Sequence, residues 1–364
     1  MSFAFRFNAH LVSLFTVLLL VLLLMVARVS YANDLTLEPS KDSFLRSGSP
    51  DTNEGANKRL NIHRVGKRRA VIAFDLSTLN SQIPAGEKVI SADLQLFITN
   101  NNRFWSKKGR PVGVHMLLED WSEGNGANAK VPRFPDNDDE EERPVRKNRG
   151  TGAGVTWRCA TDTDISNKKT DCTIKWRGGS FNSVPTDVAT VTNNTTGSLS
   201  FDVTSDVQKF LAATFQNFGW LIKKTGASKA GGIWLASREA SSNHPALNVT
   251  TGYAFTLTGE AEVPPVSTTA TGNCTVSLNN AETILQVDCT HTVANTSMAH
   301  IHQGAVGVDG PVVCDLGSGI SPISTTCAMS PSIVTALRDG LLYVNVHSAA
   351  NPGGEVRGQI ANVD

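Results

Sequence analysis

The sequence predicts an all-β protein built from two modules that follow an export signal. Short apolar or alternating segments recur along the chain, only two stretches have helical spacing, and the charge changes sign near residue 250. Residues 33–250 contain 29 Lys and Arg against 24 Asp and Glu, whereas residues 251–364 contain two Arg against nine acidic residues. Hydrophobic residues make up 40% of the 364-residue chain, which excludes a wholly disordered protein. A formal net charge of zero gives no indication of nucleic-acid binding.

Residues 1–32 predict a secretory signal peptide. Arg6 supplies the positive start, residues 11–26 form an almost unbroken apolar run, and Ser30 and Ala32 are small residues at the −3 and −1 positions of a cleavage site. The run is shorter than the ~20 residues of a membrane-spanning helix, and an uncleaved anchor is the alternative. We therefore expect a protein that is secreted, or held in the periplasm or at the cell surface, and that makes no membrane contact after cleavage.

Residues 33–250 predict a β-sandwich, because many short strands separated by turns are typical of that fold. Residues 69–76 predict a buried strand, and residues 91–98 alternate with period two. Further strands are expected at 112–118, 199–203, 219–223, 232–236 and 246–250. One helix is expected, with Thr204 or Ser205 as its cap and Val207, Phe210, Leu211 and Phe215 on one face, ending before Gly219.

A dense charge run interrupts this module. Residues 136–142 are all acidic except Asn137, and Arg143, Arg146, Lys147 and Arg149 follow. The run predicts a solvated surface loop. A calcium site is the alternative, since carboxylates are calcium ligands, although the spacing matches no calcium-loop motif.

The six cysteines predict three disulfide bonds. An even number of cysteines in an exported chain favours disulfides, and the close spacings favour pairing between sequence neighbours. No CxxC motif supports the alternative of a zinc site. The expected pairs are Cys159 with Cys172, Cys274 with Cys289, and Cys314 with Cys327.

Residues 251–364 predict a second all-β module. Strands are expected at 253–259, 274–278, 284–293, 342–347 and 355–360. Ser330, Pro331 and Gly340 have the positions of a helix cap, a first helical residue and a helix stop. No linker rich in Pro, Gly or Ser separates the modules, so we expect them to abut.

The second module carries the strongest chemical pattern. His300 and His302 stand two residues apart, so on a strand their imidazoles project to the same face. His347 ends another strand, and His291 is a further candidate. Neutral imidazoles in this number suit copper or zinc, and we predict a copper site at His300, His302 and His347. The alternative is a structural role, in which these side chains hold loops and Glu355 satisfies His300.

Glu355 and Arg357 share a face of the last strand. We expect an ion pair between them at the strand end, with ligand positioning as the alternative.

The second module also carries five specific motifs, Leu257–Pro265, Ala299–Gly304, Gly310–Val313, Leu342–His347 and Asn351–Gln359. With these motifs the module resembles the CHRD domain over residues 253–361. This resemblance implies a Greek-key β-sandwich but conveys little about biochemical function, because the role of the family is poorly defined.

The first module contains a series of short segments in a characteristic order and spacing: 42–45, 53–55, 60–62, 69–76, 90–96, 119–124, 154–157, 201–204, 217–222, 237–240 and 245–247. Through these segments it resembles the DNRLRE family, which overlaps with carbohydrate-binding module family 96, over about residues 35–250. The resemblance implies a jelly-roll-like sandwich attached to extracellular proteins, some of which bind acidic polysaccharides such as alginate. The Cys159/Cys172 pair and the charged loop depart from the common pattern.

A sugar site needs an aromatic platform with polar groups around it. We predict that site at Trp105, Lys107, Lys108 and Arg110, with Trp105 exposed, because a cationic loop bearing an aromatic ring suits a uronic-acid polymer. Trp121 and Trp157 are expected in the core.

The chain lacks the GxSxG, HExxH and phosphate-loop motifs, which favours a binding protein over an enzyme. We therefore expect a secreted, non-catalytic protein that attaches to extracellular polysaccharide or matrix. The alternatives are a copper-dependent redox protein or copper carrier, and a self-associating subunit of an extracellular assembly.

Overall fold

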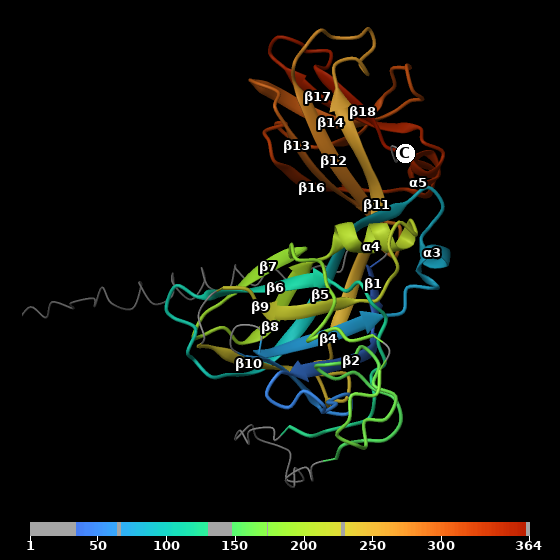
Figure 1. Ribbon diagram of the computed structural model, residues 1–364. Coiled ribbons are helices and arrows are strands. Elements are labelled where there is room, and N and C mark those ends of the chain that lie inside the picture. The colour runs from blue at the N-terminus through green and yellow to red at the C-terminus, as the bar shows by residue number, and fades with distance from the viewer. Residues whose placement is uncertain (1–33, 64–66, 130–147, 173, 227–229, 362–364) are drawn as a thin grey trace, which may run out of the picture.

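The computed structural model describes residues 34–63, 67–129, 148–172, 174–226 and 230–361. It is nearly all β, as predicted, and Figure 1 shows two modules stacked end to end and joined by strand β11 (Ala246–Thr258). Among the described residues, no helix is long and apolar enough to cross a membrane. The predicted signal peptide, the membrane-anchor alternative and the calcium alternative at 136–142 lie outside the described residues.

The first module packs two groups of antiparallel strands face to face. In one group the strand order is β2-β4-β9-β6-β7. In the other, β5 pairs with β8, β10 and β11, while β3 pairs with β10 and β1 with β11. The strands are β1 (Asp34–Leu37), β2 (Pro39–Arg46), β3 (Arg59–His63), β4 (Arg68–Phe74), β5 (Lys88–Asn101), β6 (Arg110–Met116), β7 (Asp187–Val191), β8 (Gly197–Asp202), β9 (Trp220–Lys224) and β10 (Gly232–Ala236).

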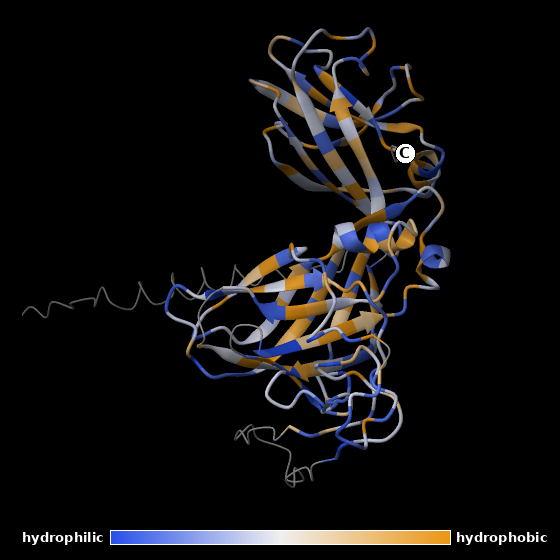
Figure 2. Cartoon of the chain, viewed as in Figure 1, coloured by the Kyte–Doolittle hydropathy of each residue, from blue (hydrophilic) through white to orange (hydrophobic). Residues whose placement is uncertain are grey.

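The core of this module lies between the two groups of strands, because alternate residues of each strand point inward. Ile72 and Ile222 come from one group and Leu94 and Ile233 from the other, and all four are fully buried in one apolar cluster. Figure 2 shows the hydrophobic segments concentrated on the strands of both modules. Burial of this apolar surface is the main favourable contribution to folding.

An irregular excursion between β6 and β7 covers the outer face of β2, β4 and β9. Trp121 and Trp176 from the excursion pack on Leu45, Val71 and Leu221 in a separate apolar cluster. Trp121 and Trp157 therefore lie not in the core between the sheets, where they were predicted, but in this outer layer, where Trp121 is buried and Trp157 is partly buried. The Cys159–Cys172 disulfide closes part of the same excursion.

Strand β11 belongs to both modules. Its residues 246–252 pair with β5, and its residues 253–258 pair with β12. The sequence predicted separate strands at 246–250 and 253–259, which is wrong, because the chain only shifts register between Thr250 and Thr251 and continues. Gly252 itself pairs with Lys88 of β5, so no turn interrupts the strand there.

The second module has two layers that meet at β11 and β18. One layer has the order β11-β12-β13-β16 and the other β18-β17-β14-β15. Thr258 of β11 pairs with Arg357 of β18, and the Cys314–Cys327 disulfide ties β15 to β16 at the opposite edge. The strands are β12 (Thr271–Leu278), β13 (Ile284–His291), β14 (Thr296–Gln303), β15 (Val312–Asp315), β16 (Ile323–Ala328), β17 (Leu342–Ser348) and β18 (Val356–Gln359).

The three predicted disulfides are all present, since Cys274 also bonds Cys289 across β12 and β13. Helix α5 (Pro331–Arg338) is confirmed with its cap, because the Ser330 side chain accepts a hydrogen bond from the Ile333 amide. A short helix α3 (Leu79–Gln82) was not predicted.

Helix α4 (Thr204–Leu211) is shorter than predicted. The chain turns at Ala213, whose φ is +53°, so Phe215 lies beyond the helix and is 46% exposed instead of facing the core. Neither predicted cap residue caps it. Val203 occupies the cap position, and the Thr204 hydroxyl accepts a hydrogen bond from the Ala92 amide of β5 instead.

Candidate metal centre

Two neighbouring strands bring the three predicted histidines together. In the antiparallel pairing of β14 with β17, His300 lies opposite Asn345 and His347 lies opposite Met298. Ala299 and Ile301 occupy the core, so the intervening His300 and His302 project from the outer face of the layer. His347 projects from the same face, diagonally across from His300.

The three imidazoles converge on one point. One ring nitrogen from each of His300, His302 and His347 lies within 4.8 Å of the other two. The shortest separation joins His300 Nδ1 to His347 Nε2 at 3.2 Å. Two nitrogens bound to one metal at about 2.0–2.1 Å with a near-tetrahedral angle lie about 3.3 Å apart, so this pair already has the spacing of two ligands.

Two of the rings are oriented by main-chain carbonyls. His302 Nδ1 lies 2.9 Å from the Gly310 carbonyl oxygen, and His347 Nδ1 lies 2.9 Å from the Pro352 carbonyl oxygen. Because a carbonyl only accepts, each Nδ1 carries the proton, and each Nε2 keeps its lone pair. Hydrogen bonds of this kind fix the tautomer of metal-binding histidines.

The lone pair of His302 Nε2 has no hydrogen-bond partner although the atom is buried. Leaving a buried polar atom unpaired costs roughly 1–3 kcal/mol. His347 Nε2 faces only His300 Nδ1, which donates to it when no other group lies between the rings. The arrangement therefore offers three nitrogen ligands, one of which is unsatisfied.

The protonation of the site suits a metal. Burial lowers the pKa of both His302 and His347, and the neighbouring His300 lowers it further, while the carbonyl hydrogen bonds act in the opposite direction. Both rings are consequently neutral at neutral pH, which is the form that binds metal ions.

The side chains of Tyr343 and Arg357 pack against the site. The Tyr343 ring stacks on His302 with the ring centroids 4.9 Å apart and an interplanar angle of 8°. The Arg357 guanidinium lies 3.4 Å from the centroid of the same Tyr343 ring. Arg357 also donates to the Ala305 and Val308 carbonyls and so holds the loop between β14 and β15 over the site.

The predicted ion pair between Glu355 and Arg357 is wrong. Arg357 is 2% exposed and lies 3.4 Å from Asp309, whereas Glu355 accepts a hydrogen bond from Thr268 at 2.8 Å. Glu355 precedes β18 and does not satisfy His300, whose Nδ1 contacts His347. His291 is also outside the cluster, with its Nε2 on the Gly319 carbonyl.

Sequence reasoning missed Glu262, which lies beside the centre. Its side chain accepts a hydrogen bond from Asn345 at 3.2 Å, and its Oε1 atom is buried without a partner. Burial raises the pKa of Glu262 to about 7, against the opposing effect of the Arg357 charge. An acidic residue in a turn carries no sequence signal that distinguishes it from a surface residue.

The predicted sugar-binding loop of the first module has a different aromatic residue at its surface. Trp105 is fully buried, because its ring packs under Lys224 and its Nε1 donates to the Gly232 carbonyl. The expectation that Trp105 is exposed is wrong, and the adjacent Phe104 is 68% exposed instead. Lys107 and Lys108 are exposed as expected, whereas Arg110 is half-buried and donates to the Ala230 carbonyl.

Comparison with known proteins bears on the second module. No curated protein matches the chain. Residues 253–360, which contain β12 to β18, the histidine cluster and Glu262, match the CHRD domain family. The second module of this chain is therefore a CHRD domain.

Proposed function

We propose that the protein is an extracellular copper-binding protein whose CHRD domain holds the ion at His300, His302 and His347. The observation that carries this proposal is the convergence of three imidazole nitrogens, one of them buried and unpartnered. The three disulfides are compatible with an oxidising compartment outside the cytoplasm.

Copper is the favoured ion because of the ligand type. Sites made of imidazole nitrogen bind Cu²⁺ more tightly than Zn²⁺ or the other divalent first-row ions. Three protein ligands also leave a fourth position open, which suits exchange of the ion with a partner or contact with a small molecule. Both uses agree with a copper carrier or a copper-dependent redox protein.

The test is the copper content of the full chain exported to an oxidising compartment. We expect about one copper per chain after dialysis, and a loss of at least tenfold in affinity for His302→Ala and for His347→Ala, because each removes one of three ligands. The control is His244→Ala, since His244 is partly exposed and hydrogen-bonds the Ala240 carbonyl far from the cluster. Wild-type protein that retains neither copper nor zinc would refute the proposal.

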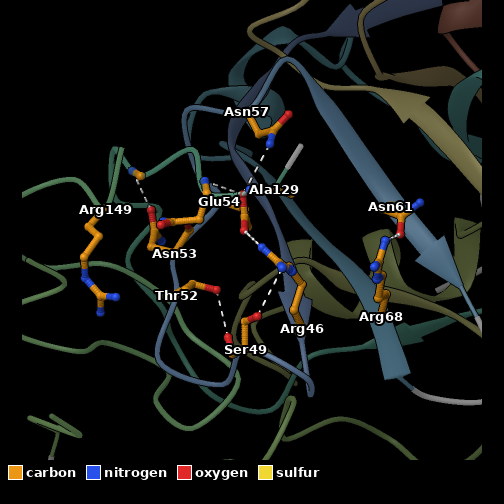
Figure 3. Close-up of polar contacts among 12 residues, drawn as sticks. Arg46, Ser49, Thr52, Asn53, Glu54, Asn57, Asn61, Arg68, Ala129 and Arg149 are labelled. Carbon is orange, nitrogen blue, oxygen red and sulfur yellow. Dashed lines mark hydrogen bonds and ion pairs between the residues drawn. The ribbon is translucent and has the colours of Figure 1, made fainter. Parts of the chain in front are cut away.

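A second candidate function, attachment to acidic polysaccharide, is favoured by a cationic pocket in the first module. The pocket has a volume of about 680 Å³. Figure 3 shows Arg46 in this region, between the Glu54 carboxylate and the Ser49 hydroxyl, with Arg68 and Arg149 on either side. The lining residues are Arg46, Ser49, Thr52, Arg68, Asn128, Ala129, Arg149 and Lys168.

The pocket fits a uronic-acid polymer because it combines guanidinium groups with hydroxyl and amide groups. Arginine binds carboxylates through paired hydrogen bonds, and the polar groups suit sugar hydroxyls. Arg46 is held in place by a 2.6 Å ion pair with the buried Glu54, so its position does not depend on a ligand.

Retention on immobilised alginate tests this second function and locates the surface responsible. We expect Lys168→Gln to weaken retention several-fold, because it removes an exposed charge from the pocket. Lys169→Gln is the matched control, since Lys169 is exposed next to it but does not line the pocket. If Lys107→Gln and Lys108→Gln abolish retention instead, the loop at 103–110 is the binding surface. Absence of wild-type retention on any acidic polymer contradicts the function.

A further inference from the structure

The first module brings three carboxylates together from segments that are distant in sequence. Asp42 lies on β2, Glu123 lies in the excursion that follows β6, and Glu239 follows β10. One carboxylate oxygen from each residue lies within 4.8 Å of the other two. Asp42 is fully buried, and the side chains of Glu123 and Glu239 are 22% and 25% exposed.

Hydrogen bonds fix some of these oxygens and leave others unused. The Asp42 Oδ2 atom accepts from the Arg238 amide at 2.7 Å, and the Glu123 Oε1 atom accepts from the Asp42 amide at 2.7 Å. The Asp42 Oδ1 and Glu239 Oε2 atoms are both buried and have no hydrogen-bond partner. The cluster therefore contains a fully buried carboxylate with one oxygen that no protein donor satisfies, which is costly unless a cation or a proton occupies the space.

The charges around the cluster do not balance. Arg238 lies 3.3 Å from Glu123 and 3.2 Å from Glu239, and its guanidinium also donates to the Ser40 carbonyl. The nearby Lys41 is engaged by Asp120 at 2.8 Å. The two cations Arg238 and Lys41 thus face four carboxylates, those of the cluster and of Asp120. About two negative charges are left, which one divalent cation would neutralise.

We propose that Asp42, Glu123 and Glu239 form a calcium site that fastens the excursion to the sandwich. Calcium takes oxygen ligands at about 2.3–2.6 Å, so two of its ligands lie at most about 5 Å apart. The 4.8 Å limit of this cluster falls inside that diameter. Magnesium, with ligands at about 2.0–2.1 Å, allows at most about 4.2 Å and demands regular octahedral geometry, so it fits this irregular set less well.

The position of the cluster gives the ion a structural task. Asn53 donates to the carbonyl oxygens of Glu123 and Val155, so the excursion is already tied to the sandwich beside the carboxylates. A calcium ion adds direct bonds between β2, the excursion and the segment after β10. The competing arrangement is a proton shared by Asp42 and Glu239. Burial, together with the charge of Glu239, raises the pKa of Asp42, which agrees with either a bound cation or a shared proton.

Calcium titration of the full chain, previously treated with a chelator, tests the proposal. We expect a saturable heat corresponding to one ion per chain in isothermal titration calorimetry. Thermal unfolding of the first module should move up by about 5–10 °C when CaCl₂ exceeds its Kd about 100-fold, with a smaller shift for MgCl₂. Terbium added in place of calcium should give luminescence sensitised by the neighbouring Trp121 ring.

Two variants and two controls make the result specific to these carboxylates. Asp42→Asn and Glu239→Gln should each weaken calcium binding at least tenfold, and the partly exposed Glu239 provides a test if Asp42→Asn fails to fold. Asp120→Asn should bind calcium as the wild type does, because Asp120 is 72% exposed and pairs with Lys41. His302→Ala should also keep calcium binding, which separates this site from the copper centre.

Two results would overturn the proposal. One is an identical unfolding temperature with and without 10 mM CaCl₂ and no binding heat, which would assign a shared proton to the cluster. The other is calcium binding that survives in Asp42→Asn and Glu239→Gln.

Discussion

At the residue scale, Glu262 is the side chain whose ionisation affects folding most clearly. It is 5% exposed, and the groups that face it are Asn345, Arg357 and Asp309. Its pKa of about 7 lies above its ordinary value of 4.5. Between pH 4.5 and pH 7 the Glu262 carboxyl is therefore protonated in the folded state and ionised in the unfolded state. The free energy of unfolding consequently falls as the pH rises from 4.5 through 7.

We predict that Glu262→Gln removes this pH dependence. A shift of this size corresponds to about 3 kcal/mol, so the variant should be more stable than the wild type at pH 8 by about that amount and similar to it at pH 4.5. Urea unfolding of both proteins at pH 5 and pH 8 measures the difference. Glu260→Gln, at an exposed position two residues away, should keep the wild-type dependence, and equal slopes for all three proteins would show that Glu262 is not responsible.

Other single residues show what the sequence could and could not predict. The i, i+2 spacing of His300 and His302 was sufficient to place both on one face of a strand. The approach of His347 depends on the register of β14 against β17, and a slip of one residue would turn it into the core. The prediction placed Trp105 at the surface, where the structure has Phe104 instead, because a loop has no periodicity that tells which of two adjacent rings is buried.

At the scale of elements, the loop between β17 and β18 connects the fold to the histidine cluster. Its Pro352 carbonyl fixes His347, and its Gly354 has a φ of +135° in close contact with Asn345. A Cβ atom at Gly354 would lie 2.5 Å from Asn345 Oδ1 and 2.7 Å from Glu262 Oε1. Both contacts are far shorter than van der Waals distance, and both partners are buried.

We predict that Gly354→Ala displaces this loop. The variant should lose about 1–3 kcal/mol of stability from strain and overlap, and about 10- to 100-fold in copper affinity from the lost orientation of His347. Thermal unfolding without metal and copper titration measure the two effects separately. Gly353→Ala is the matched control, because a Cβ atom there meets nothing within 4 Å. Equal behaviour of the two variants would contradict this role of the loop.

The ends of the helices could be predicted only where the local sequence signals are strong. Ser330, Pro331 and Gly340 bounded α5 as predicted, since the cap bond and the glycine with φ of +67° are local features. Both ends of α4 were misjudged, because the Thr204 hydroxyl at its start accepts a hydrogen bond from the Ala92 amide of β5 and the chain turns at Ala213 soon after its end.

At the scale of the whole molecule, composition and cysteine spacing predicted two disulfide-bonded β modules with opposite charges. The sequence could not predict the cluster of Asp42, Glu123 and Glu239, since no two of these residues are near each other along the chain. Such clusters arise from tertiary packing, in this protein from the excursion laid over β2 and β4.

The shared strand β11 also determines how the molecule responds to mechanical load. A tether of unstructured residues would let the two modules rotate independently, but here a pull along the chain is met by ladder hydrogen bonds from β11 to β1 and β5 in the first module and to β12 in the second. The histidine cluster of the second module is consequently joined to the basic first module by one continuous strand and not by a flexible tether.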